Sequence, residues 1–277
     1  MGECLDTYRR FYYHDLMPEV FLPRMTFAEV EAILDQVELA AIPTGSNEAH
    51  GPHLPLKVDA AIAEHVTVQA AQRLYPKVIV TPTLAVGHSP QHLDFAGSMT
   101  LRVETQINVL LDYCRSLMTY GIRRFAIVNA HGANMQPNAL AARRITEDLG
   151  VKVINLFYTH AIDPETAKTL PSNMPGHADD FEGSLILHIC PEDTHMDRTH
   201  EIEDKYGLAG QPKPAPPGHA FLATTTFNQK GLRQSHPCDV GSDSYKNICA
   251  ENGKRYSDIC AKAIARAFQV FIAHVPE

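Results

Sequence analysis

Hydrophobic and polar positions follow two different periods along the first part of the chain. Short apolar runs, typical of buried strands, lie at residues 38–43, 77–81, 124–129 and 151–156. Segments with an apolar residue every three or four positions, typical of amphipathic helices, lie at about 26–37, 59–74, 103–120 and 137–150. Strands that alternate with helices predict a parallel sheet covered by helices on both faces.

The pattern weakens after residue 156. A short apolar helix is predicted over 181–189, before Pro191, and a long amphipathic helix over about 244–273. The segment 205–243 is rich in Pro, Gly and Thr, and no second core follows it that would make it a linker. We therefore expect a surface excursion from one domain over residues 1–277, an α/β/α sandwich of three layers with a mainly parallel central sheet.

Composition and charge argue against some classes of protein, such as nucleic-acid-binding and membrane-spanning proteins. The net charge of −8 and the lack of a basic cluster argue against nucleic acid as a partner. No apolar run reaches the roughly 18 residues of a membrane span, and the first residues lack the features of a signal peptide. Six scattered cysteines favour reduced thiols. We expect a cytoplasmic protein that acts on a small molecule.

The densest candidate chemistry follows the first predicted strand. Glu48, His50, His53 and Asp59 lie within twelve residues, in the loop where α/β proteins place their sites. Carboxylate and imidazole are the ligands that a borderline divalent metal prefers. Asp59 has an alternative role as a helix N-cap. His53, between Pro52 and Leu54, is more suited to shape the loop or to donate to a ligand than to bind metal.

Two further segments carry residues of the same kind. His131 directly follows the strand 124–129, where it is either a ligand or a loop histidine. Asp179 and Asp180 suit the N-terminal turn of the helix over 181–189. Glu182 lies among apolar residues of that helix, and a carboxylate that enters a core needs a partner such as a cation. A long loop over 83–100 also carries His88 and His92, to which the pattern gives no role.

The three segments together resemble signatures of the creatininase family of amidohydrolases. Residues 45–59 match the family pattern G-x-x-E-x-H-G-P-H-L-P-L-x-x-D, and residues 129–134 resemble N-G-H-G-x-N. Residues 177–184 resemble H-A-G-x-x-E-T-S, and Phe95 to Ser98 is a weaker match to F-P-G-T. The first signature is long and specific, whereas the others are short.

The resemblance implies a fold, a cofactor and residue roles. It implies an α/β/α sandwich, often assembled as a hexamer, with two divalent ions: zinc is favoured, and manganese and iron also suit the ligands. Glu48, Asp59 and His131 would bind one ion. His50, Asp59 and Glu182 would bind the other, with Asp59 as the bridge. Water between the ions would be the nucleophile. His177, the candidate general acid, and Glu182 are the expected catalytic residues.

The chain also departs from the family pattern. Ala133 stands where some members supply a carboxylate, so that we assign this ligand to Glu182. Asp179 and Gly183 replace a glycine and a threonine beside the site. Creatinine-cleaving members have tryptophan near the site, and this chain has no tryptophan. We expect hydrolysis of a C–N bond in a cyclic amide or formamide-like substrate. The alternatives are hydrolysis of a C–C bond in a cyclic ketone and a non-catalytic metal-binding member.

Overall fold

The computed structural model describes residues 17–93, 95–170, 176–201 and 245–276. The predicted excursion over 205–243 therefore lies outside the described residues. In the described part, four parallel strands form one sheet in the order β2-β1-β3-β4. They are β1 (Leu39–Thr44), β2 (Val78–Val80), β3 (Arg124–Asn129) and β4 (Lys152–Phe157). The predicted mainly parallel sheet is confirmed, and each predicted strand is present to within two residues at its ends.

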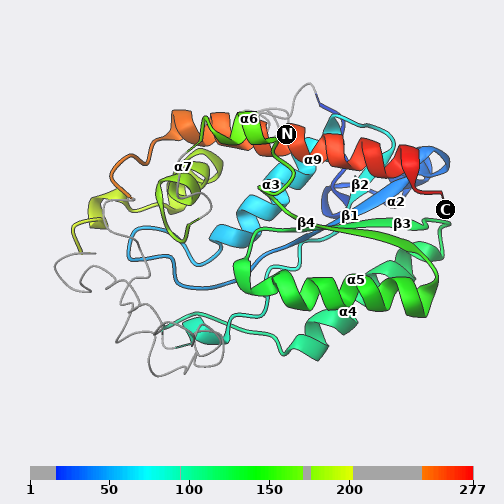
Figure 1. Cartoon of the computed structure of the whole chain (residues 1–277), viewed down its shortest axis with the longest axis horizontal. Helices are drawn as coiled ribbons and strands as arrows, with labels where there is room; N and C mark the ends of the chain where they lie inside the picture. The colour runs from blue at the N-terminus through cyan, green and yellow to red at the C-terminus, as the bar shows by residue number, and fades with distance from the viewer. Residues whose placement is uncertain (1–16, 94, 171–175, 202–244, 277) are drawn as a thin grey trace, which may run out of the picture.

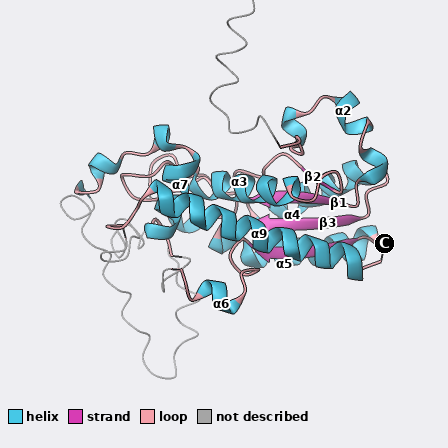
Figure 2. Cartoon of the chain, turned by 90° about the horizontal axis from the view of Figure 1, so that it is seen from above, coloured by secondary structure: helices cyan, strands magenta, loops and turns pink. Residues whose placement is uncertain are grey.

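Helices cover the two faces of this sheet, as Figure 1 shows. The helices α3 (Val58–Gln72) and α9 (Ala250–His274) pack on one face, and α4 (Val103–Met118) and α5 (Met135–Leu149) on the other. The helix α7 (Asp180–Ile189) packs against α9 and α3, off one end of the strands (Figure 2). Two short helices, α2 (Phe27–Glu31) and α6 (Pro164–Ala167), lie outside these layers.

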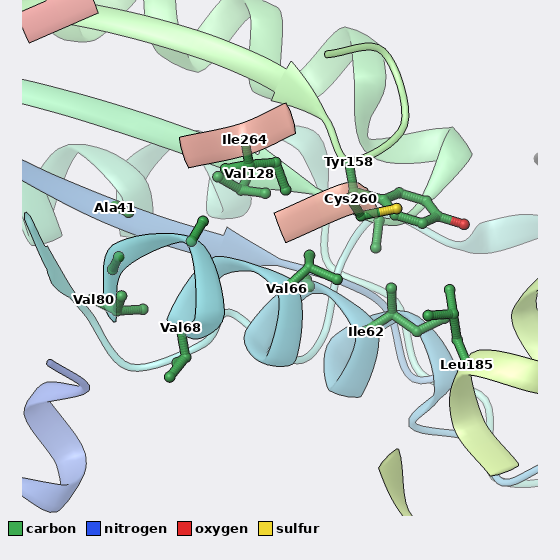
Figure 3. Close-up of a cluster of buried hydrophobic side chains, with 14 of the residues drawn as sticks. Ala41, Ile62, Val66, Val68, Val80, Val128, Tyr158, Leu185, Cys260 and Ile264 are labelled. Atoms are coloured by element: carbon green, nitrogen blue, oxygen red, sulfur yellow. The ribbon is translucent and has the colours of Figure 1, made fainter. Parts of the chain in front are cut away.

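The alternation of side chains along each strand divides the core in two. Ala41, Val80 and Val128 point toward α3 and α9, where they meet residues such as Val66 and Ile264 (Figure 3). Their neighbours along the strands, among them Ile42, Ile79 and Ile127, point toward α4 and α5. Continuous apolar strands are therefore buried on both faces, as expected for a parallel sheet.

Two predicted helices begin or end elsewhere. The capping box at Thr26 is present, but α2 ends at Glu31 and a 3₁₀ turn over Leu34–Gln36 follows, which tightens the chain before β1. The last helix begins at Ala250 rather than at 244. Side chains of α7 hold the residues before it, because Asn247 donates to Asp180 and the Cys249 amide donates to Ser184 Oγ.

The described residues also bear on the expectations about membrane spans and cysteines. None of their helices combines the length and the apolar character that a membrane span requires. The cysteines among them, at 114, 190, 249 and 260, are free thiols.

Candidate metal centre

Segments far apart in the sequence meet at the carboxyl ends of the strands. The loop after β1 carries Glu48 and His50, the first turn of α3 carries Asp59, the loop after β3 carries His131, and the first turn of α7 carries Glu182. All five side chains are buried. The structure thus brings together every residue that the sequence nominated as a metal ligand, at the edge where parallel α/β sheets place their sites.

Glu48, Asp59 and His131 form the first half of this cluster, which we call site 1. The Nδ1 atom of His131 lies 2.9 Å from Asp59 Oδ2 and 3.3 Å from Glu48 Oε1. All three side chains sit on or directly after elements of the central sheet and its first helix. His131 Nδ1, Asp59 Oδ2 and Glu48 Oε1 are thus close enough together for one cation to bind all three atoms.

His50, Asp59 and Glu182 form the second half, which we call site 2. His50 Nε2 lies 3.1 Å from Asp59 Oδ1 and 3.7 Å from Glu182 Oε2. Asp59 therefore turns one oxygen to each half of the cluster, which is the arrangement of a carboxylate that bridges two cations. It does not cap α3, because the N-cap residue is Lys57 and no side chain fills that role.

Backbone carbonyls fix the tautomers of both imidazoles. His50 Nδ1 donates to the Glu48 carbonyl at 3.0 Å, and His131 Nε2 donates to the His88 carbonyl at 3.1 Å. In the neutral rings, the remaining nitrogens therefore direct lone pairs at carboxylate oxygens. Apart from His131 Nδ1, no hydrogen-bond donor among the described residues faces Asp59 Oδ2. Acceptors that face acceptors in a buried space fit a bound cation, and this carboxylate–imidazole set suits a borderline divalent metal.

The charges of the cluster point the same way. Burial alone would lower the pKa of both imidazoles, but the carboxylates raise it to about 10 for His50, mainly through Asp59, and for His131, through Asp59 and Glu48. Burial raises the pKa of Glu182 well above its usual value, against the pull of His50. Burial opposes ionisation of Glu48 too, but its histidine partners hold that pKa well below the usual range. Without metal, both imidazoles therefore hold a proton at neutral pH, and these protons fill places that divalent cations would take.

His177 lies against the cluster from the segment before α7. Its Nε2 atom donates to the Ala49 carbonyl at 2.9 Å, and its Nδ1 atom lies 3.8 Å from Glu48 Oε1. Its ring stacks on that of His50, with centroids 4.3 Å apart. Ala178, the next residue, adopts a φ of 51° and donates its amide to Glu182 Oε2 at 2.7 Å. A left-handed conformation is strained for alanine. Here it allows the Ala178 amide to donate to the Glu182 carboxylate.

The loop between β2 and α4 contributes residues to which the sequence gave no role. The Ser89 hydroxyl donates to Glu48 Oε2, and His92 Nδ1 lies 3.1 Å from the same oxygen. The His92 ring stacks on His177, with centroids 5.0 Å apart. Ligand atoms of Glu48, His92 and His177 lie within 4.8 Å of one another, as do those of His50, His177 and Glu182, so that each set could also hold a metal ion. The signal was present as two histidines in a long loop after a strand, but nothing in the spacing said which one turns inward.

One buried amide joins the three loops that carry the cluster. The Asn134 side chain donates to the Gly45 carbonyl and accepts from the His88 amide, each at 2.9 Å. Gly45 packs so closely that a Cβ there would overlap the backbone nitrogen of Ala60, at the start of α3. The end of β1 and the first turn of α3 are thus fixed against each other, which fixes Glu48 relative to Asp59.

Two neighbouring predictions have different outcomes. Asp179 is confirmed as the residue that opens α7, since its side chain accepts from the amides of Phe181 and Glu182. His53 is fully buried, but neither ring nitrogen has a hydrogen-bond partner among the described residues. The expected role of His53 as a donor to a ligand is therefore not seen.

Comparisons with known proteins agree with the fold and with the family that the sequence resembles. The family model for creatininase (creatinine amidohydrolase) matches residues 23–268. A mycofactocin precursor peptide peptidase of Mycobacterium tuberculosis is 33% identical over 239 residues, which cover 81% of this chain and 84% of the relative. A 3-dehydro-scyllo-inosose hydrolase of Thermotoga maritima is 28% identical, over 67% of this chain and 61% of the relative. A solved structure described as the manganese form of creatininase has 25% identity and a TM-score of 0.72, and the match covers 94% of this chain and all of that one.

The parallel α/β fold carries a carboxylate–imidazole cluster that could hold metal at the ends of its strands, and the family match and the relatives place the chain among hydrolases. The chain belongs to the creatininase family, whose model it matches over nearly its whole length.

Proposed function

We propose that the protein is a metal-dependent amidohydrolase that holds two divalent cations, one in site 1 and one in site 2. The observation that carries the proposal is the position of Asp59. Its two oxygens face two different imidazoles, His50 at 3.1 Å and His131 at 2.9 Å. Backbone carbonyls force both rings to offer lone pairs there. Zinc fits this mixture of ligands, and manganese and iron are the alternatives.

Two such cations would lower the pKa of a water molecule and polarise the carbonyl of the substrate. Neighbouring side chains hold the carboxylates that would bind these cations. Glu48 is held by Ser89 and His92, and Asp59 is held between two rings, so that neither carboxylate has to reorganise during the reaction.

His177 is the residue we assign to proton transfer. The Ala49 carbonyl occupies the Nε2 proton, which leaves Nδ1, on the side of Glu48, as the atom that gains and loses a proton. A base that takes a proton from water there can return it to the departing amine as an acid. Glu182, the other expected catalytic residue, acts through the cation of site 2.

The substrate we propose is a small amide whose C–N bond is cleaved. Creatinine itself is disfavoured, because the chain has no tryptophan, which the family resemblance places beside that substrate. The peptidase relative makes a peptide bond the amide to test beside lactams and formamides. The inosose hydrolase relative supports the second candidate, cleavage of a C–C bond in a cyclic ketone, since that reaction needs the same water and polarised carbonyl. By family resemblance, we propose that the chain acts as a homo-oligomer.

Elemental analysis of the purified protein, followed by a substrate screen, tests the proposal. We expect about two equivalents of a divalent metal per chain, loss of hydrolysis after chelation, and recovery on addition of Zn²⁺ or Mn²⁺. The screen comprises lactams, formamides, short peptides and cyclic ketones. His177→Ala should abolish turnover and keep the metal. A protein without metal, whose activity ignored chelators, would contradict the hydrolase mechanism, and loss of metal in His177→Ala would make His177 a ligand.

A further inference from the structure

His92 is the residue of the β2–α4 loop that touches both parts of the proposed machinery. Its Nδ1 atom lies 3.1 Å from Glu48 Oε2 and 3.0 Å from Ser89 Oγ. Its ring lies nearly parallel to that of His177, at an angle of 13° and a centroid distance of 5.0 Å. The side chain is only 4% exposed. The His92 imidazole therefore contacts both the carboxylate of Glu48, a proposed metal ligand, and the ring of His177, the proposed proton carrier.

The hydrogen-bond pattern determines which nitrogen of His92 carries a proton. The Ser89 hydroxyl has a single hydrogen, and it donates this hydrogen to Glu48 Oε2. Ser89 Oγ and Glu48 Oε2 then both face His92 Nδ1 as acceptors. Nδ1 must therefore be the donor. Its target is the Glu48 oxygen that points away from site 1, while Oε1 of the same carboxylate faces His131 at 3.3 Å.

The stacking contacts determine what His92 does for His177. The His177 ring stacks on two other rings, that of His50 with a centroid distance of 4.3 Å and that of His92 with a centroid distance of 5.0 Å. His50 is held by the cluster, and His92 by Glu48 and Ser89. His177 has its own hydrogen bond to the Ala49 carbonyl, which permits the ring to rotate about that bond. The two stacked rings, of which His92 is the more nearly parallel, restrict this rotation and keep Nδ1 on the side of Glu48.

We propose that His92 is a positioning residue that orients the Glu48 carboxylate through a hydrogen bond and holds the His177 ring through a stacking contact. This rests on the proposed function of site 1 and His177. It adds that one side chain sets the geometry of both, so that the loop after β2 is part of the working site. Partners that orient a ligand in this way commonly change metal affinity by about 10- to 100-fold when they are removed.

Two substitutions separate the hydrogen bond from the stack. His92→Asn places an amide nitrogen where Nδ1 lies and removes the ring, whereas His92→Phe keeps a ring and removes the donor. His195→Asn is the matched control, because His195 is exposed and lies outside the cluster. Zn²⁺ affinity, from competition with a chromophoric chelator, reads the orientation of Glu48. The rate at which diethyl pyrocarbonate modifies His177, followed by mass spectrometry, reads how firmly its ring is held.

We expect the two readouts to respond to different variants. His92→Phe should weaken Zn²⁺ binding by about tenfold and leave His177 modification at the wild-type rate. His92→Asn should keep Zn²⁺ affinity within about twofold, because its side-chain amide can still donate a hydrogen bond to Glu48. It should speed His177 modification several-fold, because the ring that stacks on His177 is lost. The control should change neither readout.

Other outcomes overturn the inference in distinct ways. If both variants shifted both readouts together with the melting temperature, His92 would be a general core residue. If His92→Phe lost one whole zinc equivalent, His92 would be a ligand rather than a positioning residue. Unchanged readouts in both variants would remove any role. If wild-type protein bound no Zn²⁺, the proposed function would fail by itself, and the His177 modification rates would still decide the stacking contact.

Discussion

Site 1 and site 2 share Asp59 but are built in different ways. Apart from Asp59, site 1 takes its residues from the loops after β1 and β3, and its contacts are 2.9 and 3.3 Å. Site 2 depends on Glu182 from α7, which lies 3.7 Å from His50 and is held by the amide of the strained Ala178. Site 1 is therefore formed by the sheet, whereas site 2 is completed by a helix that packs on the sheet. We expect the first to bind metal more tightly than the second.

The strongest way to break this comparison is to remove the residue that both sites share. Asp59→Ala should abolish binding of both ions, and hydrolysis should fall by at least about 10³-fold, because the cations supply several kcal/mol of stabilisation. Elemental analysis and the initial rate measure this. Asp148→Ala, on the exposed face of α5, is the control. A variant that kept one full equivalent of metal would show that Asp59 is not the bridge.

Removing one partner from each site should separate them. Glu182→Gln should leave one tightly bound ion, and His131→Ala should leave only a weakly bound one, weaker by about 10- to 100-fold. Zn²⁺ titration against two chelators of different affinity measures both. Equal losses in the two variants would mean that the helix-borne half is as preorganised as the half on the sheet.

The packing beneath site 1 gives a prediction on stability. Gly45→Ala should lower the free energy of unfolding by about 1–3 kcal/mol, because its Cβ would meet the backbone of Ala60. Gly132→Ala is the matched control, since nothing lies within 4 Å of a Cβ there. Urea unfolding of metal-free protein compares them. If both alanines cost the same, the contact between β1 and α3 would not be what fixes Glu48 against Asp59.

The two sites should also differ in the protons that metal binding displaces. Without metal, the pKa of His131 is raised to about 10, so that site 1 holds one proton at neutral pH. In site 2, the pKa of His50 is also raised to about 10, so that this ring holds a proton, and burial raises the pKa of Glu182 well above its usual value, which favours a further proton there. Because metal competes with these protons, affinity rises with pH, about tenfold per unit for each proton displaced. Calorimetry in buffers of different ionisation enthalpy should find about one proton displaced by the first ion and more than one by the second, and equal counts would contradict the assignment.

The smallest effect is expected at the turn before α7. Ala178→Gly relieves a left-handed alanine but frees the unfolded chain, so that the free energy of unfolding should change by less than about 1 kcal/mol. Zn²⁺ affinity of site 2 alone should fall by a few-fold, because the Glu182 carboxylate loses a firmly placed amide. Thermal unfolding and Zn²⁺ titration test this. A fall at site 1 as well would show that the turn supports both halves.

Sequence periodicity predicted the sheet better than the boundaries of its helices. The strand residues are apolar throughout, and burial on both faces leaves little alternative for such runs. The helix expected over 26–37 was wrong in its second half, and the last helix begins six residues late, because contacts from Asp180 and Ser184 hold the preceding residues. Such contacts join residues more than 60 positions apart, and no local pattern encodes them.

The candidate site shows the same division. Glu48, His50 and Asp59 could be named because they crowd into one segment, and Glu182 because its apolar neighbours made an unpaired acid costly. The family resemblance supplied the role of His177. His92 and Ser89 were not found, since their importance lies in which way a long loop folds over Glu48. A side chain that acts by holding another residue belongs to no ligand motif, so that its position in the sequence does not reveal its role.

The Asn134 amide, which joins the loops at Gly45 and His88, also has a consequence for loop length. Loops of most enzymes tolerate insertions, because their tips are free. Here three loops are tied to one another beneath the metal ligands, so that an added residue in any of them would displace the other two. Redesign of substrate preference in this scaffold should therefore change residue types within these loops and keep the number of residues in each.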